Sequence, residues 1–156
     1  MLRHATKYYM TNNKQLEQVK LFMNTFGQKV ELVPTLLPKT VTDLRISLSQ
    51  EELNEYAQAC EDGDLVEIAD ALTDRLYVLL GDFLAHGMGD LLEPLFDEVQ
   101  RSNMSKLDKD GNVLYRADGK ILKSDLFTKP SLEPIVRGYL EEGKEVKVNP
   151  LGESIK

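Results

Sequence analysis

The chain has 156 residues, of which 42% are hydrophobic and 29% are charged, as expected for one globular domain. Its net charge of −7 argues against nucleic-acid and anionic-membrane partners, which favour a basic surface. One cysteine excludes an intrachain disulfide framework, and no apolar run approaches the ~18 residues that span a bilayer. We therefore expect an intracellular, cytoplasmic protein with a single domain over residues 1–156, an ordered core at 14–142 and a tail at 143–156.

The first predicted helix covers residues 14–26, with Asn12 or Asn13 as its cap and Gly27 as its stop. Apolar side chains recur there at helical spacing and are expected in the core: Leu16, Val19, Phe22, Met23 and Phe26. Residues 30–44 contain two prolines and are predicted to form an extended connector. Arg45, which follows, can pair with an acidic side chain or face solvent, and solvent is the default expectation.

Two further helices are predicted to form an antiparallel hairpin. The first runs from Leu44 or Ser49 to Cys60, and the second from Asp64 to Ala85. Between them, Gly63 suits the end of one helix and Asp64 suits the N-cap of the next. Cys60 is expected to be partly buried, and the lone His86 after the second helix is expected to be structural.

Each hairpin helix carries acidic residues at one-turn spacing, which places them on one face. The first cluster is Glu51, Glu52 and Glu55, and the second is Glu67, Asp70 and Asp74. Acidic residues on helices usually form a solvated face. The positions that flank the second cluster are apolar, however, which indicates a largely buried helix: Ile68, Ala69, Leu72, Leu76 and Leu79.

The hairpin should bring the two acidic clusters together. With the turn centred near Asp62, Glu55 would lie opposite Ala69, and Asn54 would lie opposite Asp70. Facing carboxylates repel one another unless a cation neutralises them, and Mg²⁺ binds carboxylate, water and phosphate oxygens. The sequence therefore predicts a Mg²⁺ site whose ligands are Glu51, Glu52, Glu55, Glu67 and Asp70.

The C-terminal part supplies groups that can hold phosphate. A helix is predicted after Asp90, with apolar residues facing a core, among them Phe96 and Val99. It ends near residues 102–106, where Asn103, Ser105 and Lys106 can bind phosphate oxygens. Residues 107–127 are predicted to form a small β-hairpin, whose lysines, among them Lys123, would close over the phosphates. A last helix is predicted from Ser131 to Gly143.

The two acidic motifs, followed by Ala71–Asp74 and by residues 98–106, resemble those of the all-α nucleoside triphosphate pyrophosphohydrolases. This superfamily holds the MazG-like proteins, the dimeric dUTPases and phosphoribosyl-ATP pyrophosphohydrolase, and the last branch is the most similar. The resemblance runs from about Val19 to about Ile135. It implies Mg²⁺-dependent cleavage between the α and β phosphates, with Mn²⁺ as an alternative ion. It also implies that Glu51 or Glu52 activates the attacking water and that Phe26 and Gln28 contact the base.

We thus expect an all-α fold with a minor β-hairpin. The helix from Asp64 to Ala85 is apolar over much of its circumference, so its hairpin should form a four-helix bundle with that of a second copy, as in the resembled family. A homodimer or a tetramer would result. The expected substrate is a (deoxy)nucleoside triphosphate, and the product is the monophosphate with pyrophosphate. The alternatives are the phosphoribosyl-ATP reaction of histidine biosynthesis and a catalytically silent helical dimer.

Overall fold

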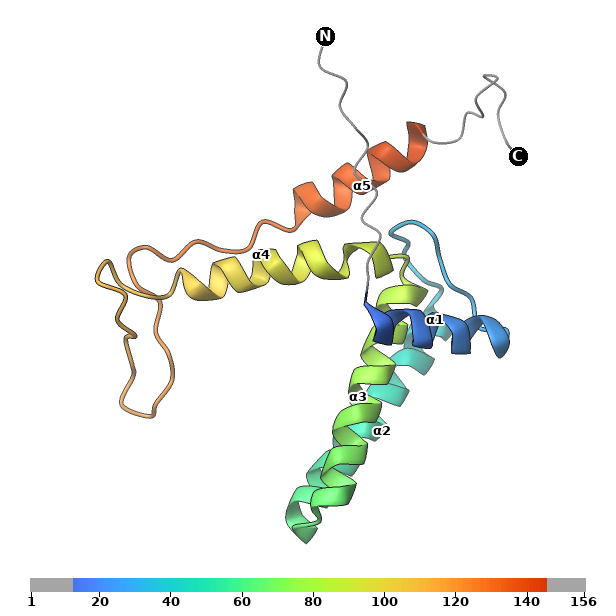
Figure 1. The fold of residues 1–156 in the computed structure, drawn as a ribbon, viewed down its shortest axis with the longest axis horizontal. Coiled ribbons are helices and arrows are strands. Elements are labelled where there is room, and N and C mark those ends of the chain that lie inside the picture. Colours follow the sequence, from blue (N-terminus) through green and yellow to red (C-terminus); the bar gives the residue numbers. More distant parts are fainter. Residues whose placement is uncertain (1–12, 146–156) are drawn as a thin grey trace. The chain divides into compact units, whose positions relative to one another are not determined.

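A computed structural model describes residues 13–145 of the chain. These residues form five α-helices and one short 3₁₀ helix (Figure 1): α1 (Lys14–Thr25), α2 (Lys39–Asp62), α3 (Leu65–Ala85), η1 (Gly89–Leu91), α4 (Leu92–Met104) and α5 (Glu133–Glu145). The predicted all-α class is confirmed. Within the described part, no helix combines the length and the apolar character needed to cross a membrane. Of the predicted tail, residues 143–145 belong to α5, and the remainder lies outside the described residues.

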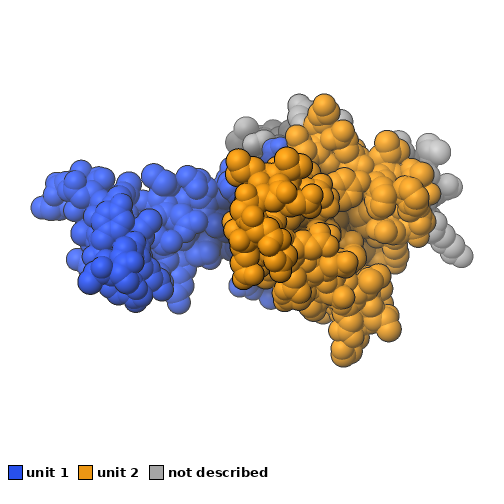
Figure 2. Space-filling model, turned by 90° about the horizontal axis from the view of Figure 1, so that it is seen from below, with its two compact units in different colours: residues 1–7, 91–156 blue, residues 8–90 orange. Residues whose placement is uncertain are grey.

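The chain divides after Asp90 into two compact units, coloured separately in Figure 2. The first along the chain, drawn in orange as unit 2, contains α1, α2 and α3, and α3 packs against both of the other helices. The second contains α4, α5 and the segment between them. The single domain stays a prediction.

Helix α1 begins and ends as the sequence predicts. The Asn13 side chain accepts a hydrogen bond from the Leu16 amide at 3.0 Å, and Gly27, just past the helix, has a left-handed φ of 70°. Three of the five predicted core side chains are buried, namely Leu16, Val19 and Met23. The prediction was wrong for Phe22 and Phe26, which are 38% and 68% exposed. Helical spacing shows which side chains share a face, but not how far a neighbouring helix covers that face.

Helix α2 begins at Lys39, earlier than predicted, because the Pro38 carbonyl accepts the amides of Val41 and Thr42 at 2.9 and 3.1 Å. Proline suits the first position of such a turn because its φ is fixed near the helical value. The predicted turn after α2 is confirmed. Gly63 has a φ of 67°, and the Asp64 carboxylate accepts the amides of Val66 and Glu67 at 2.9 and 3.2 Å.

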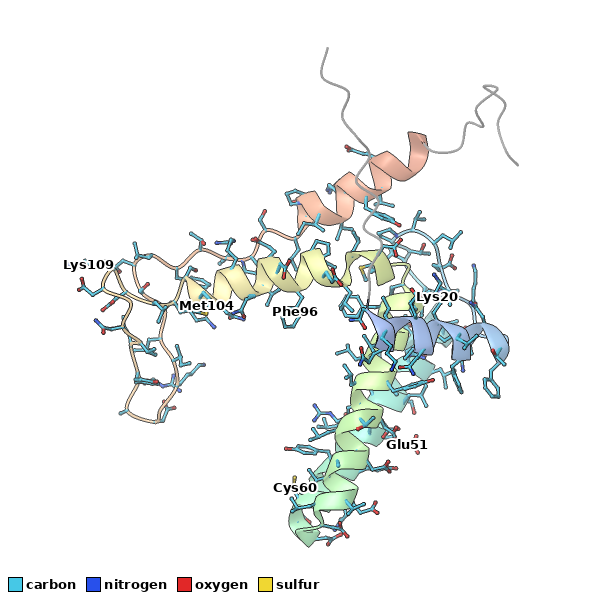
Figure 3. The ribbon with its side chains drawn as sticks, in the orientation of Figure 1. Lys20, Glu51, Cys60, Phe96, Met104 and Lys109 are labelled. Atoms are coloured by element: carbon cyan, nitrogen blue, oxygen red, sulfur yellow. The ribbon has the colours of Figure 1, made fainter. Side chains whose placement is uncertain are left out.

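Cys60 lies near the turn of the hairpin (Figure 3). It is exposed rather than partly buried. The prediction was wrong because successive residues of a helix point in different directions, and the neighbouring Ala59, not Cys60, lies on the buried side of α2.

The connector before α2 is fixed to the end of α3. The Thr35 amide donates to the His86 carbonyl at 2.9 Å, and the His86 ring nitrogen Nδ1 lies 3.0 Å from the Thr35 carbonyl oxygen. Gly87 has a φ of +68°, and a Cβ atom there would overlap the Val33 carbonyl. His86 therefore has the structural role that the sequence suggested.

In the second unit, two apolar residues predicted to face a core are exposed. Phe96 is 67% exposed and Val99 is 37% exposed, so the apolar spacing on α4 again overestimated burial. Between α4 and α5, Tyr115 and Ile121 form one isolated antiparallel bridge, and residues 13–145 contain no regular strand. The small β-hairpin thus stays a prediction, as does the bundle with a second copy.

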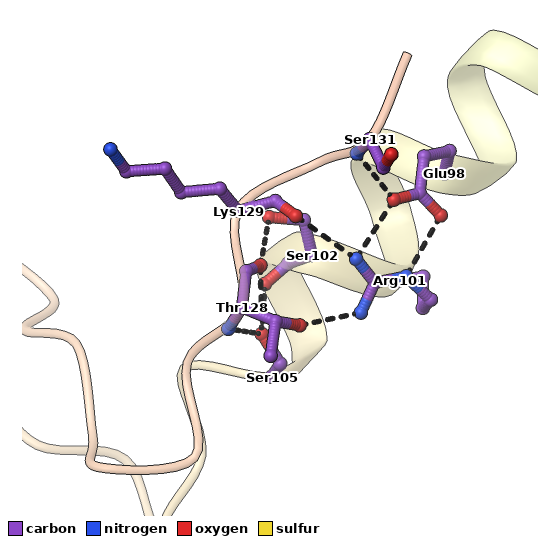
Figure 4. Close-up of polar contacts among 7 residues, drawn as sticks. All are labelled: Glu98, Arg101, Ser102, Ser105, Thr128, Lys129 and Ser131. Atoms are coloured by element: carbon purple, nitrogen blue, oxygen red, sulfur yellow. Dashed lines mark hydrogen bonds and ion pairs between the residues drawn. The ribbon is translucent and has the colours of Figure 1, made fainter. Parts of the chain in front are cut away.

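A polar clasp joins α4 to the segment before α5 (Figure 4). Arg101 donates to both carboxylate oxygens of Glu98 at 2.8 Å and to the Thr128 hydroxyl at 2.7 Å. Glu98 also accepts the Ser131 amide at 2.7 Å. The buried Ser102 donates its hydroxyl to the Thr128 carbonyl at 2.9 Å. The clasp holds an otherwise irregular segment against one helix.

Candidate functional site

The contacts between α2 and α3 define the register of the acidic hairpin. A Cβ atom on Gly81 would overlap the guanidinium group of Arg45, and these two residues are equally far along the chain from Gly63. Glu52 and Asp74 are also equally far from Gly63, and both line one pocket. The turn is thus centred on Gly63 rather than on Asp62, because α2 continues through Asp62.

This register corrects the predicted pairing of the two acidic clusters. Glu52 of α2 faces Asp74 of α3, whereas the sequence placed Glu55 opposite Ala69 and Asn54 opposite Asp70. Glu52 and Asp74 are partly buried, whereas Glu55 and Asp70 are exposed. Along the line where α2 and α3 meet, which we call the stripe, each helix therefore contributes one partly buried carboxylate in place of an apolar side chain.

Glu52 lies at the electrostatic centre of the cluster. Its Oε2 atom is buried and has no hydrogen-bond partner. Burial raises the pKa of Glu52, and the charges of Glu55, Asp74, Glu51 and Asp70 raise that pKa further. A buried carboxylate oxygen without a partner is costly, so this group is expected to gain a proton or a cation.

The remaining predicted ligands lie along the edge of the stripe. Glu51, Glu55, Glu67 and Asp70 are exposed, and Figure 3 shows Glu51 along the hairpin. Glu67 is not among the charges that act on Glu52. In the described part of the chain, no three His, Cys, Asp or Glu side chains converge closely enough to hold a metal ion. Electrostatic effects reach farther than metal coordination does, so acidic side chains can raise the pKa of Glu52 without converging on one point.

The donor set fits a hard divalent cation. Its members are carboxylates, which Mg²⁺ prefers, and a few of them with water can complete the coordination of this ion. The unpartnered Glu52 oxygen is the atom that such an ion would satisfy. The chemistry of these residues therefore suits a hard cation, although their side chains do not converge on one point in this structure.

A pocket of about 320 Å³ adjoins the two facing carboxylates. Its aromatic lining consists of Phe22 from α1 and Tyr77 from α3, whose ring centroids are 5.6 Å apart in an edge-to-face arrangement. Gln28, one of the predicted base contacts, also lines it. Phe26, the other, is not part of the lining; its ring stacks on Phe22 with a centroid distance of 4.4 Å.

A family model described as phosphoribosyl-ATP pyrophosphohydrolase matches residues 19–103, which is more than half of the chain. The chain belongs to this family. It is accordingly an enzyme, a hydrolase that acts on phosphoric anhydrides, and the resemblance inferred from the acidic motifs is confirmed. None of the curated proteins compared with the chain matches it.

The region shared with the phosphoribosyl-ATP pyrophosphohydrolase family contains both acidic clusters and Asn103, but not Lys106 or Lys123. These three predicted phosphate-binding residues belong to the second unit. There the Lys106 ammonium donates to the Asn103 side-chain oxygen at 2.8 Å, and the Lys123 ammonium lies 4.5 Å from the centroid of the Phe127 ring. The Ser105 hydroxyl donates to the Ser102 carbonyl at 2.7 Å, and so has a structural role.

Sequence reasoning missed three residues that line this pocket. Tyr77 follows Asp74 by one helical turn, and Phe22 precedes Phe26 by one turn, so spacing alone could have placed both beside the predicted site. Arg45 lines the pocket as well and pairs with Asp82, which contradicts the default expectation that it faces solvent. No local signal indicates its partner, which lies far along the chain.

Proposed function

We propose that this chain is a Mg²⁺-dependent pyrophosphohydrolase that cleaves the α–β phosphoanhydride of a nucleotide and releases pyrophosphate. The observation that carries the proposal is the buried, unpartnered oxygen of Glu52, surrounded by the charges of four other acidic residues, in a chain of a pyrophosphohydrolase family. A divalent cation would neutralise the negative charge of such a cluster and would also bind the phosphate oxygens of a polyphosphate substrate.

Glu51, Glu52, Glu55, Glu67 and Asp70 are the proposed metal ligands, and Asp74 joins them because it faces Glu52 across the pocket. When bound, Mg²⁺ or Mn²⁺ neutralises phosphate charge and makes a bound water more acidic. Glu51 or Glu52 would accept the proton of the attacking water. Glu52 suits this role because its carboxylate lines the pocket with Asp74, and a carboxylate within reach of a bound water can accept its proton.

The remaining predicted contacts concern the substrate. Asn103, Lys106 and Lys123 would bind phosphate oxygens with an amide and two ammonium groups. Gln28 and Phe26 would contact the base, with Phe22 and Tyr77 as the aromatic wall beside them. Aromatic faces suit a planar base, and the side-chain amide of Gln28 can donate to and accept from the edge of a base.

Two substrate classes follow from different observations. The acidic cluster and the aromatic pocket suit a free (deoxy)nucleoside triphosphate. The matched family is described by its reaction on phosphoribosyl-ATP, which favours that compound as the second candidate. Both contain the same α–β phosphoanhydride, so the proposed chemistry is the same for either substrate.

The test is an assay of pyrophosphate release from each common nucleoside triphosphate and from phosphoribosyl-ATP, with Mg²⁺, with Mn²⁺ and with a chelator. We expect metal-dependent release from at least one substrate. Glu52→Gln should lower kcat at least a hundredfold, because general-base catalysis alone contributes roughly 10²–10⁴-fold. Glu61→Gln, an exposed residue at the end of the same helix, should leave kcat unchanged. A folded wild-type protein that releases no pyrophosphate under any of these conditions would support the silent helical dimer instead.

A further inference from the structure

Arg45 and Asp82 form an ion pair between the two helices that carry the acidic clusters. The Arg45 Nε atom donates to Asp82 Oδ1 at 2.5 Å, and one guanidinium nitrogen donates to the backbone carbonyl of Val78 at 2.6 Å. The two side chains are only 13% and 26% exposed. An ion pair this sheltered, with a second hydrogen bond to the opposite backbone, fixes the geometry more strongly than an exposed pair does.

Gly81 makes room for this arrangement. It is buried near the C-terminal end of α3, and a Cβ atom there would overlap the Arg45 guanidinium. Glycine inside a helix is less stable than alanine by roughly 0.8–1.0 kcal/mol. The position thus combines an unfavourable helix residue with a direct contact to the arginine.

The ion pair lies two turns from the facing carboxylates and on the same faces of both helices. Arg45 precedes Glu52 by two turns on α2, and Gly81 follows Asp74 by two turns on α3. All four residues line the same pocket. Between them, the side chains of Leu48 and Val78 line the pocket with apolar surface, which is less directional than hydrogen bonds are. The Ser49 hydroxyl adds one longer hydrogen bond, of 3.5 Å, to the other carboxylate oxygen of Asp82.

A slip of one helical turn would move the carboxylates of α2 by about 5.4 Å relative to those of α3, which is more than the reach of one metal ion. We propose that Arg45 is a positioning residue, which holds the register of α2 against α3 through Asp82 and Val78 and thereby keeps Glu52 opposite Asp74. This inference rests on the proposed function. Arg45 acts through the carboxylates and is not itself a catalytic residue.

The first experiment separates register from stability with Arg45→Met, Asp82→Met and the double variant. Each single variant leaves one partly buried charge unpaired and should unfold at a lower temperature, whereas the double variant should recover most of the loss, since apolar side chains often replace a buried ion pair without cost. We expect all three to lose at least tenfold in kcat, with a smaller change in KM. They should also need about tenfold more Mg²⁺ for the half-maximal rise in thermal midpoint. Lys39→Met, which removes an exposed ion pair of α2, is the matched control.

The second experiment uses Gly81→Ala, which should displace the guanidinium while improving helix propensity. Without metal, we expect a smaller fall in the thermal midpoint than in Arg45→Met, because the gain in helix propensity offsets part of the weakened ion pair. We also expect lower kcat and weaker Mg²⁺ stabilisation. Gly138→Ala is the matched control, because nothing lies within 4 Å of a Cβ atom at that helical glycine. It should leave kcat and the Mg²⁺ response unchanged.

The outcomes distinguish the inference from the proposed function. Wild-type kcat and Mg²⁺ response in the double variant and in Gly81→Ala would overturn the positioning role while leaving the enzyme assignment intact. A wild-type protein without pyrophosphohydrolase activity would overturn the proposed function, and the Mg²⁺ shift of the same variants would still test the register. A wild-type protein with neither activity nor Mg²⁺ shift would overturn both.

Discussion

Glu52 occupies a position on α2 where packing against α3 would ordinarily select an apolar side chain. Its buried oxygen lacks a partner, and its pKa is raised, mainly by burial. The exposed carboxylates around Glu52 offer a cleaner test of the metal site than Glu52 itself does. They can be shortened with little effect on packing.

We predict that Glu55→Ala and Asp70→Ala each lower pyrophosphohydrolase activity by orders of magnitude, since a loss of about 4 kcal/mol in transition-state stabilisation corresponds to roughly a thousandfold in rate. Without metal, the thermal midpoints should be unchanged or slightly higher, because one of several repelling charges is gone. Both variants should lose most of the Mg²⁺-induced rise in midpoint.

Calorimetric scans with and without Mg²⁺, together with initial rates, measure these three quantities. A solvated acidic face predicts almost no change in any of them. A purely structural metal site predicts a lost Mg²⁺ shift with no activity to lose. Wild-type rates and a wild-type Mg²⁺ shift in both variants would refute the ligand assignment for Glu55 and Asp70.

At the scale of elements, the clasp between α4 and the segment before α5 depends on one carboxylate. Hydrogen bonds from the Arg101 side chain and then from the Ser131 amide lower the pKa of Glu98 from its ordinary value of 4.5 to about 2. A lowered folded-state pKa gives stability that is present above pH 4.5 and is lost as the pH falls toward 2.

We predict that Glu98→Gln weakens the clasp at neutral pH and removes the part of the acid-induced loss that arises between pH 4.5 and pH 2. Glutamine is neutral and has one side-chain oxygen, so it cannot accept two hydrogen bonds from Arg101 as the Glu98 carboxylate does. Hydrogen exchange at the Ser131 amide should therefore be faster in the variant than in the wild type at pH 7. Asp97→Asn, an exposed neighbour on the same helix, should exchange like the wild type; equal protection of Ser131 in Glu98→Gln would contradict the role of this carboxylate.

At the scale of the whole molecule, one face of α3 is left exposed by the described residues of its own unit. Leu72, Leu76 and Leu79 share this face and are 47%, 49% and 51% exposed. Exposed apolar stripes on a helix are typical of protein interfaces, and a two-fold axis would place the same stripe of a second copy against this one. We therefore propose a homodimer in which two hairpins form a four-helix bundle, with a tetramer as the alternative assembly.

We predict that Leu76→Glu shifts the protein toward monomer and lowers its thermal midpoint, because a charge in an apolar interface is unpaired. Light scattering after size-exclusion chromatography measures the mass directly. Val66→Glu, at a more exposed apolar position on another face of α3, should keep the wild-type mass. A wild-type protein that is monomeric at micromolar concentration would refute the bundle.

The sequence by itself determined the features that depend on neighbours within a few residues. The Asn13 cap, the left-handed Gly63 and the Asp64 cap were all predictable, because each is a local hydrogen bond or a φ that glycine adopts readily. The acidic motifs likewise identified the hairpin and the enzyme family, since acidic residues one turn apart share a face whatever packs against them.

Only the tertiary structure decided the register of the hairpin and the extent of burial. The turn shifted from Asp62 to Gly63 because α2 continues to its glycine stop, and this small change replaced the Glu55–Ala69 pairing with Glu52 opposite Asp74. Phe22 and Phe26 have core-like spacing but are exposed, since spacing does not show where a neighbouring helix ends. Arg45 pairs with Asp82 on the opposite helix. A contact between residues so far apart in the chain depends on how the helices pack, not on local propensity.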